Sequence, residues 1–255
     1  MTPPSPEFRD WFENEAFWRE AYAFMFPDTR IAEAADQVAK AIALTSPAGK
    51  AVLDLCCGPG RCSLALAKLG LSVTGVDRTK FLIDKARTRA RKEAVHVEWI
   101  QEDMRNFVRK NSYDLALSMF TSFGYFETRD EDSLVLNNIF ASLRPGGRIL
   151  IDLLGKETLA RIYQPSLAET APDGSILIQQ PQVLDGWSRL RNTWTVVRNG
   201  KARRFIIELN LYSGQELRER LEAAGFGEVK LYGNFEGDPY GPDARRLVAV
   251  GRRPC

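Results

Sequence analysis

Histidine is almost missing from this sequence, since His96 is the only one among 255 residues. A Ser-His-Asp triad, a multi-histidine zinc site and a two-histidine iron centre all depend on this residue type. Its scarcity argues against each of them. We therefore expect a reaction without a histidine proton shuttle, and no metal site.

Cysteine is also scarce, and its spacing argues against two further classes of protein. Cys56, Cys57 and Cys62 lie within seven positions, and Cys255 is the last residue. A secreted disulfide scaffold has an even, distributed set of cysteines, and a zinc site needs four ligands at suitable spacing. We expect these cysteines to be small side chains that fill a tight loop in a reducing cytosol.

Neither charge nor hydrophobicity is strongly biased along the chain. The 35 basic and 33 acidic side chains leave a formal net charge of +2, so no whole-protein field attracts nucleic acid. No apolar run approaches the roughly 18 residues that span a bilayer, and residues 1–17 lack a signal-peptide pattern. These absences predict a cytoplasmic protein with no membrane partner and no nucleic-acid partner. The oligomeric state stays open, with a homodimer among the options.

The sequence does contain a regular alternation of strand and helix signals from residue 50 onward. Short apolar runs, typical of buried strands, alternate with amphipathic stretches, and this rhythm favours a parallel sheet covered on both faces. We predict an α/β fold with a Rossmann-like, doubly wound, mostly parallel sheet of seven strands. The predicted strands lie at residues 51–57, 71–77, 95–103, 113–120, 146–154, 227–233 and 245–251.

Two segments depart from this alternation. Apolar and aromatic residues at helical spacing over residues 11–44 predict an N-terminal helical cap. After the fifth strand, runs near 175–183, 186–197 and 202–211 predict an antiparallel β insertion, with Asn199-Gly200 as a hairpin signal and Ser213 as the N-cap of the next helix. The predicted division is 1–47 cap, 48–155 Rossmann-like core, 156–211 insertion acting as a substrate lid, and 212–255 closing helix with the last two strands.

The residues that carry chemistry lie where the predicted strands end. Asp54 to Gly60 span a strand end and a glycine turn, and such turns let a ligand approach the backbone closely. The dehydrogenase pattern G-x-G-x-x-G fails because Ser63 stands at its third glycine, and the P-loop pattern is also absent. The turn alone therefore indicates only some nucleotide-like ligand.

Acidic residues further along the chain sharpen that expectation. Asp77 ends the second strand, where an acidic side chain can accept both hydroxyls of a ribose. Asp103 ends the third strand and Met104 follows it, so this pair could hold an exocyclic amine and pack on an adenine face. Open α/β sheets bind their ligands at the carboxyl ends of the strands, where all these residues fall.

In this order the motifs resemble those of the class I S-adenosylmethionine-dependent methyltransferases. Asp54 to Gly60 resembles the first motif of that family, Asp77 its ribose acid, Asp103-Met104 its adenine site, and residues 143–147 (LRPGG) its approach to the fifth strand. The resemblance implies S-adenosylmethionine as cofactor. Cys56 departs from the family, which usually has glycine at that position.

A finer resemblance points to bacterial small-molecule methyltransferases that modify amines or hydroxyls of sugars and natural products. The segment from Phe120 to Phe126 and the antiparallel insertion look like theirs. This resemblance implies transfer of a methyl group to a nitrogen or oxygen of a small-molecule acceptor by in-line displacement. A sulfonium is already a good leaving group, so alignment and exclusion of water matter more than proton transfer.

Two sets of site residues follow from the residues and the resemblance together. The first is predicted to bind the cofactor: Tyr22, Asp54, Cys56, Gly58, Gly60, Arg61, Asp77, Arg78, Asp103, Met104, Met119 and Phe120. The second is predicted to bind the acceptor: Phe123, Tyr125, Asn192, Trp194 and Tyr240. No catalytic base is assigned, and Tyr22 and Tyr125 are the candidates.

Three alternative functions stay open at this point. One is an RNA or protein methyltransferase on the same fold, which the near-neutral charge disfavours. Another is a non-catalytic cofactor-binding protein, against which the intact set of cofactor positions argues. The third is a nicotinamide oxidoreductase, and the missing third glycine argues against it.

Overall fold

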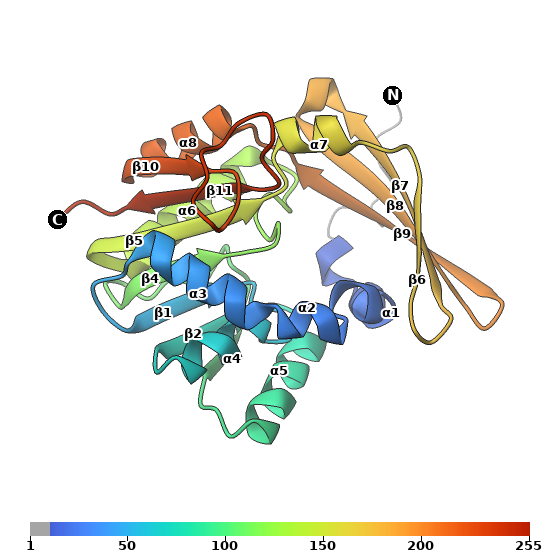
Figure 1. Ribbon diagram of the computed structural model, residues 1–255, viewed down its shortest axis with the longest axis horizontal. Coiled ribbons are helices and arrows are strands. Elements are labelled where there is room, and N and C mark those ends of the chain that lie inside the picture. The colour runs from blue at the N-terminus through green and yellow to red at the C-terminus, as the bar shows by residue number, and fades with distance from the viewer. Residues whose placement is uncertain (1–10) are drawn as a thin grey trace.

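The computed structural model describes residues 11–255, so the first ten residues of the predicted cap lie outside the described chain. The larger of two sheets contains β1 (Ala51–Leu55), β2 (Ser72–Asp77), β3 (Glu98–Gln101), β4 (Tyr113–Ser118), β5 (Leu143–Leu153), β10 (Gly227–Tyr232) and β11 (Leu247–Arg252). Their order is β10-β11-β5-β4-β1-β2-β3 (Figure 1). Strands β1 to β5 pair in parallel, and β11 runs antiparallel to β5 and β10. The predicted α/β fold is confirmed.

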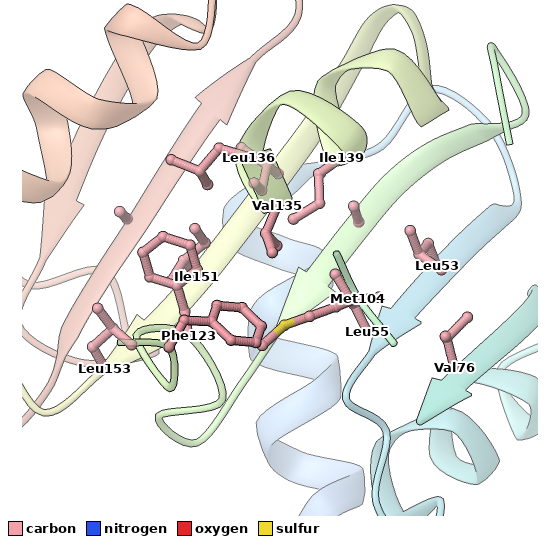
Figure 2. Packing of buried hydrophobic residues seen from close by; sticks show 14 of the residues in the cluster. Leu53, Leu55, Val76, Met104, Phe123, Val135, Leu136, Ile139, Ile151 and Leu153 are labelled. Carbon is pink, nitrogen blue, oxygen red and sulfur yellow. The ribbon is translucent and has the colours of Figure 1, made fainter. Parts of the chain in front are cut away.

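Helices cover both faces of this sheet, which explains why most of its inner strands are continuous apolar runs. On one face α3 (Ala34–Thr45) and α4 (Arg61–Lys68) pack against β1, β4 and β5. On the other face lie α6 (Arg129–Ser142) and α8 (Gly214–Ala223). Figure 2 shows Val135, Leu136 and Ile139 of α6 gathered with Leu53 and Ile151 in this second layer. The helix α5 (Lys80–Lys92) packs along β2 and β3.

The strand order reverses at β1, which pairs with β2 on one side and β4 on the other. At such a point the connections leave toward opposite faces of the sheet and open a crevice above the strand ends. The loops after β1, β2, β3 and β4 all begin at this edge. The fold therefore brings the predicted cofactor motifs to one place.

Two strands of the large sheet begin three residues from their predicted start, whereas the other strand ends of this sheet agree with the prediction within two residues. The third strand is shorter, so His96 lies exposed ahead of β3. The fifth strand is longer, because Leu143 already pairs with Tyr113 and the 143–147 segment belongs to the strand.

The predicted insertion is a separate antiparallel sheet that follows α7 (Lys156–Ile162). It contains β6 (Leu167–Thr170), β7 (Ile176–Leu184), β8 (Arg189–Arg198) and β9 (Lys201–Asn210), in that order. The hairpin between β8 and β9 is confirmed, since Asn199 and Gly200 both adopt positive φ, 51° and 71°, as a tight two-residue turn requires. The prediction missed β6, and it placed the start of β8 too early because Trp187 lies in a short 3-10 helix, Asp185–Trp187.

The N-terminal elements divide their packing between the two sheets. They are η2 (Trp11–Glu13), α1 (Glu15–Met25) and α2 (Asp28–Ala32), followed by α3. While α3 lies on the large sheet, Nε1 of Trp11 donates to the carbonyl of Glu208 in the insertion over 2.9 Å. The ring of Phe17 lies 5.6 Å from that of Trp194 and 5.5 Å from that of Phe205. Over residues 11–255, none of the helices is both long enough and apolar enough to cross a bilayer.

Candidate active site

A cavity lies above the carboxyl ends of β1, β2, β3 and β4. It encloses about 1050 Å³, part of which is open to solvent. The predicted residues that line it are Asp54, Cys56, Gly58, Arg61, Asp77, Arg78, Asp103, Met104, Met119, Phe120 and Tyr125. The structure thus brings together four segments that the sequence separates by up to about 70 positions.

The glycine turn after β1 forms the floor of the cavity. Gly58 has a φ of 56° and its amide donates to Oδ2 of Asp77 over 2.9 Å. Gly60 has a φ of 80°, and a Cβ there would lie 2.6 Å from the ring of Trp99. Gly60 therefore allows the close approach of the turn to β3, and it does not line the cavity.

Cys56 occupies a left-handed conformation with a φ of 59°. Such a conformation costs an L-residue other than glycine roughly 1–2 kcal/mol, so the glycine-like geometry of the turn is kept without glycine. The Sγ atom lies 3.4 Å from Sδ of Met104. Burial raises the pKa of the Cys56 thiol well above its usual value, so the thiol stays protonated.

Asp77 ends β2 as a buried carboxylate that organises the turn. Its Oδ2 accepts the Gly58 amide, and its Oδ1 accepts the Thr79 amide over 2.8 Å. Burial raises the pKa of Asp77, against the lowering effect of these two bonds. A carboxylate has about four acceptor sites, so two remain for a ligand.

Asp103 is held by arginine. Arg105 donates Nε to Oδ1 over 3.1 Å and Nη2 to Oδ2 over 2.8 Å, and Nε of Arg78 lies 3.3 Å from Oδ2. Burial alone would raise the pKa of Asp103, but the hydrogen bonds and charge of Arg105 hold it below the usual value. Asp103 is therefore ionised near neutral pH. Arg78 also pairs with Glu13, which ties η2 to this end of the cavity.

The opposite end of the cavity is formed by the turn after β4 and the start of α4. The guanidinium carbon of Arg61 lies 3.4 Å above the ring centroid of Phe120, a close cation–π contact. Nη1 of Arg61 donates to the carbonyl of Arg30 over 3.2 Å. Met119, buried at the end of β4, completes this wall.

Aromatic side chains cover the cavity from the side of the insertion. Tyr125 lies 4.8 Å from Trp11 and 6.3 Å from Phe12, measured between ring centroids. Phe12, Trp18 and Phe126 line the cavity beside it. Burial raises the pKa of Tyr125 above its usual value.

The comparisons with known proteins agree with this geometry. Residues 52–147 match the family model described as "Methyltransferase domain". The match begins in β1 and ends in β5, so it covers the strand ends that border the cavity. The chain contains a methyltransferase domain, and its fold is the class I methyltransferase fold.

Individual similarities extend over more of this methyltransferase. It is 26% identical over 217 residues to YqeM of Bacillus subtilis, which is named as a methyltransferase; the match covers 83% of this chain and 87% of that protein. The structure of an S-adenosylmethionine-dependent methyltransferase from Clostridium acetobutylicum superposes with a TM-score of 0.78 at 14% identity, covering 96% of this chain and 99% of the other. The sugar N-methyltransferase KedS8 from Streptoalloteichus superposes with a TM-score of 0.70 at 18% identity, covering 91% of each chain.

The cavity of this methyltransferase fits its cofactor. The backbone at Gly58 lies open to it, because a Cβ there would meet nothing closer than the ring of Phe26 at 3.5 Å. Asp77 lines the same floor with acceptor capacity left over.

Several predicted residues of the methyltransferase lie away from the cavity. Tyr22 turns toward α5, with its ring 5.6 Å from that of Phe81. Phe123 is 1% exposed and packs on Tyr212, 5.5 Å away between centroids. Tyr240 donates its hydroxyl to Glu157 over 2.7 Å. Spacing along a helix or loop does not reveal such orientations, and the structure does not bring these three residues to the cavity.

Asn192 and Trp194 share one face of β8, as predicted, but they do not line the cavity either. This face turns toward α1, because Trp194 packs on Phe17. Nδ2 of Asn192 donates to Gln179 over 3.0 Å. Among the described residues, no hydrogen-bond partner is found for Oδ1 of Asn192 or Nε1 of Trp194, although both atoms are buried.

The sequence interpretation missed a group of cavity residues in the methyltransferase. Five of them belong to the N-terminal segment, where helical spacing predicts only packing, and the others are next to or near predicted positions. They include Phe12, Trp18, Met25, Phe26, Arg30, Thr79, Glu102, Ser122 and Phe126. Residues next to a predicted motif residue could have been predicted from their position alone. The sequence of the N-terminal segment, by contrast, does not indicate which of its side chains point into the cavity.

Proposed function

We propose that this methyltransferase methylates a nitrogen of a small molecule whose amine is neutral when it enters the cavity. The carrying observation is that each acidic group lining the cavity already accepts hydrogen bonds from the chain itself, and we assign the capacity left on Asp77 to the cofactor. Asp77 accepts two backbone amides, Asp103 is bound by Arg105, and Oδ2 of Asp54 accepts the hydroxyl of Ser63 over 2.5 Å. A hydroxyl acceptor needs a base to take its proton, whereas a neutral amine is already nucleophilic.

The remaining titratable side chains around the cavity agree with this proposal. Tyr125 has a raised pKa, so near neutral pH it keeps its proton and is a poor base. Burial also raises the pKa of Cys57, as it does for Cys56, and thiols that stay protonated do not compete as nucleophiles. Oε1 of Glu102 accepts the Asp103 amide over 2.8 Å. The aromatic wall of Phe12, Trp18 and Phe126 would exclude water from the acceptor.

On the cofactor side we assign roles to the residues that line the cavity. Asp77 would accept the ribose hydroxyls, and Asp103 with Met104 would hold the adenine. Arg61 and Phe120 would border the opposite end. When bound, S-adenosylmethionine supplies a methyl group on a sulfonium, which needs no activation. The chain then has to align the acceptor with that group and keep water out.

We propose an amino sugar as the acceptor. The unpartnered buried atoms of Asn192 and Trp194 are assigned no part in its recognition, because both residues lie outside the cavity. That KedS8 is named as a sugar N-methyltransferase supports this choice.

The test is an assay with a matched pair of acceptors: an amino sugar, and the same sugar with a hydroxyl in place of the amine. We expect the amine alone to gain a methyl group, detected by mass spectrometry. The kcat/KM for the amino sugar should rise with pH as the amine of the sugar loses its proton. Methylation of the hydroxyl sugar alone would overturn the proposal.

A variant separates alignment from proton transfer. We expect Tyr125→Phe to keep its turnover within about tenfold of wild type, because general-base catalysis is worth roughly 10²–10⁴ in rate and Tyr125 supplies none. A larger loss in turnover, with unchanged binding of S-adenosylhomocysteine, would make Tyr125 the base and favour a hydroxyl acceptor.

A further inference from the structure

The turn that follows β4 holds two adjacent residues in a left-handed conformation. Phe120 has a φ of 62° and Thr121 a φ of 63°. Neither is glycine, and Thr121 is β-branched, for which positive φ is a true outlier. Two such residues in sequence are strained, and they persist only where the surrounding structure holds them. The question is which groups hold this turn.

The carboxylate of Asp152, at the end of β5, holds the first residue of the turn. This side chain is fully buried, and its Oδ2 accepts the Phe120 amide over 2.7 Å. The carbonyl of Asp152 accepts the Thr121 amide over 2.9 Å. Both amides of the strained pair therefore bond to one residue of the neighbouring strand.

Arg246, just before β11, holds Asp152 and the turn together. Its Nε donates to Oδ1 of Asp152 over 2.6 Å, and its Nη2 donates to Oδ2 over 3.0 Å. The same Nη2 lies 3.1 Å from Oγ1 of Thr121. The planar guanidinium reaches all three oxygens at once, which a lysine ammonium could not do in this geometry.

The held turn presents the Phe120 ring to the cavity. Arg61 stacks on one face of that ring at 3.4 Å, and Phe235 lies 6.4 Å away between centroids. Met119, immediately before the turn, lines the cavity too. A change in the φ angles of Phe120 and Thr121 would therefore move the cavity wall and the Arg61 side chain.

We propose that Asp152 and Arg246 are positioning residues, which fix the strained Phe120–Thr121 turn and thereby set the affinity for the cofactor. Neither residue lines the floor of the cavity where Asp77 and Gly58 lie. They act by holding the Phe120 ring in its position against Arg61. The inference rests on the proposed placement of the cofactor in this cavity, which the binding of S-adenosylhomocysteine to the wild-type chain tests separately.

The experiment is calorimetric titration of S-adenosylhomocysteine into wild type, Asp152→Asn and Arg246→Lys. In Asp152→Asn the side-chain NH₂ group would face either the Phe120 amide or Arg246. Both of these groups are hydrogen-bond donors, so one of the bonds that hold the turn would be lost. We expect Kd to rise about tenfold or more in both variants, the scale of one hydrogen bond to a charged group. The KM for S-adenosylmethionine should rise more than kcat falls. Arg246→Lys keeps the buried carboxylate paired with a cation, so it provides the folded variant if Asp152→Asn is unstable.

Two further variants make the result specific to the turn. Asp114 accepts the Ala51 amide over 2.9 Å and pairs with Arg144 over 2.9 Å, at the amino end of β4 and therefore at the other end of this strand from the cavity. Asp114→Asn makes the same chemical change there and should leave Kd unchanged. Thr121→Gly placed in the Asp152→Asn background should recover most of the lost affinity, because glycine adopts positive φ without being held.

The proposal is overturned if folded Arg246→Lys or Asp152→Asn binds S-adenosylhomocysteine as wild type does. It is also overturned if Asp114→Asn weakens binding equally, or if Thr121→Gly recovers none of the affinity. A wild-type chain that fails to bind the ligand would instead refute the proposed cofactor site.

Discussion

Carboxylates around one cavity differ in charge state because their partners differ. Arg105 holds Asp103 ionised, whereas Asp54 accepts hydrogen bonds from Ser63 and has only the more distant charge of Arg61 to favour its ionised form. Burial raises the pKa of Asp54 to about 6, with Ser63 and Arg61 opposing the shift. Asp54 therefore changes charge within an accessible pH range, and Asp103 does not.

Ionisation of Asp54 should make the stability of the protein depend on pH. Its pKa is higher in the folded chain than in the unfolded one, so its contribution is complete below about pH 4 and lost as pH rises through about 6. We expect the free energy of unfolding of wild type to fall, relative to Asp54→Asn, by about 1 kcal/mol between about pH 5 and pH 7. Asparagine can still accept the Ser63 hydroxyl, and Asp132, whose pKa burial also raises to about 6, is common to both proteins. Parallel pH profiles from urea unfolding would contradict this account.

At the residue scale, the sequence predicted positions well and orientations poorly. Asp54, Asp77 and Asp103 line the cavity because a strand end fixes where its last residue lies. Tyr22 lies within a helix, where a step of one position turns a side chain by about 100°. Apolar side chains occur on several faces of α1, so the pattern could not say which aromatic residue would meet the cavity.

Among the elements, α8 begins with a capping box whose glutamate also contacts two other helices. Ser213 caps the helix as predicted, and its side chain and that of Glu216 bond reciprocally to each other's amides. Glu216 also accepts Lys156 of α7 over 2.9 Å and Arg129 of α6 over 3.2 Å. The hydrogen bonds and charges of these partners, Lys156 first, outweigh burial and lower the pKa of Glu216 to about 2.

Glu216→Ala should therefore destabilise the protein by about 1–2 kcal/mol, since a cap and two ion pairs are lost together. Because the pKa of Glu216 is lowered by folding, this contribution is present above about pH 4.5 and is lost as pH falls toward 2. Glu219→Ala, in the same helix, removes only an exposed contact with Gln215 and should change the free energy by less than about 0.5 kcal/mol. Equal effects of the two substitutions in urea unfolding would refute this role of Glu216.

Element types were predictable wherever the apolar pattern was continuous. The strands β1, β2, β4 and β11 are buried along most of their length, so each is a nearly unbroken apolar run in the sequence. By contrast, every residue of β6 is exposed, so its four residues carry no such run and the strand was missed. Pairing with β7 alone makes it a strand, and pairing is not visible in one segment.

Over the whole molecule, the insertion and the N-terminal segment meet above the strand ends. Figure 1 shows α1 between the large sheet and the strands β7, β8 and β9. Contacts such as Trp11 with Glu208 and Phe17 with Trp194 join segments almost 200 residues apart. The sequence predicted both additions, but not their contact, because nothing local in either segment specifies the other as its partner. The domain boundaries at 47, 155 and 211 remain predictions.

The central claim is that the cavity above β1, β2, β3 and β4 binds S-adenosylmethionine, with Asp77 on the ribose. Calorimetric titration of wild type and Asp77→Asn with S-adenosylhomocysteine, and of wild type with NAD, tests it most directly. We predict that wild type binds S-adenosylhomocysteine but not NAD, and that Asp77→Asn weakens binding by about tenfold or more while it still unfolds cooperatively. Binding of NAD alone, or an unchanged Kd in Asp77→Asn, would contradict the account.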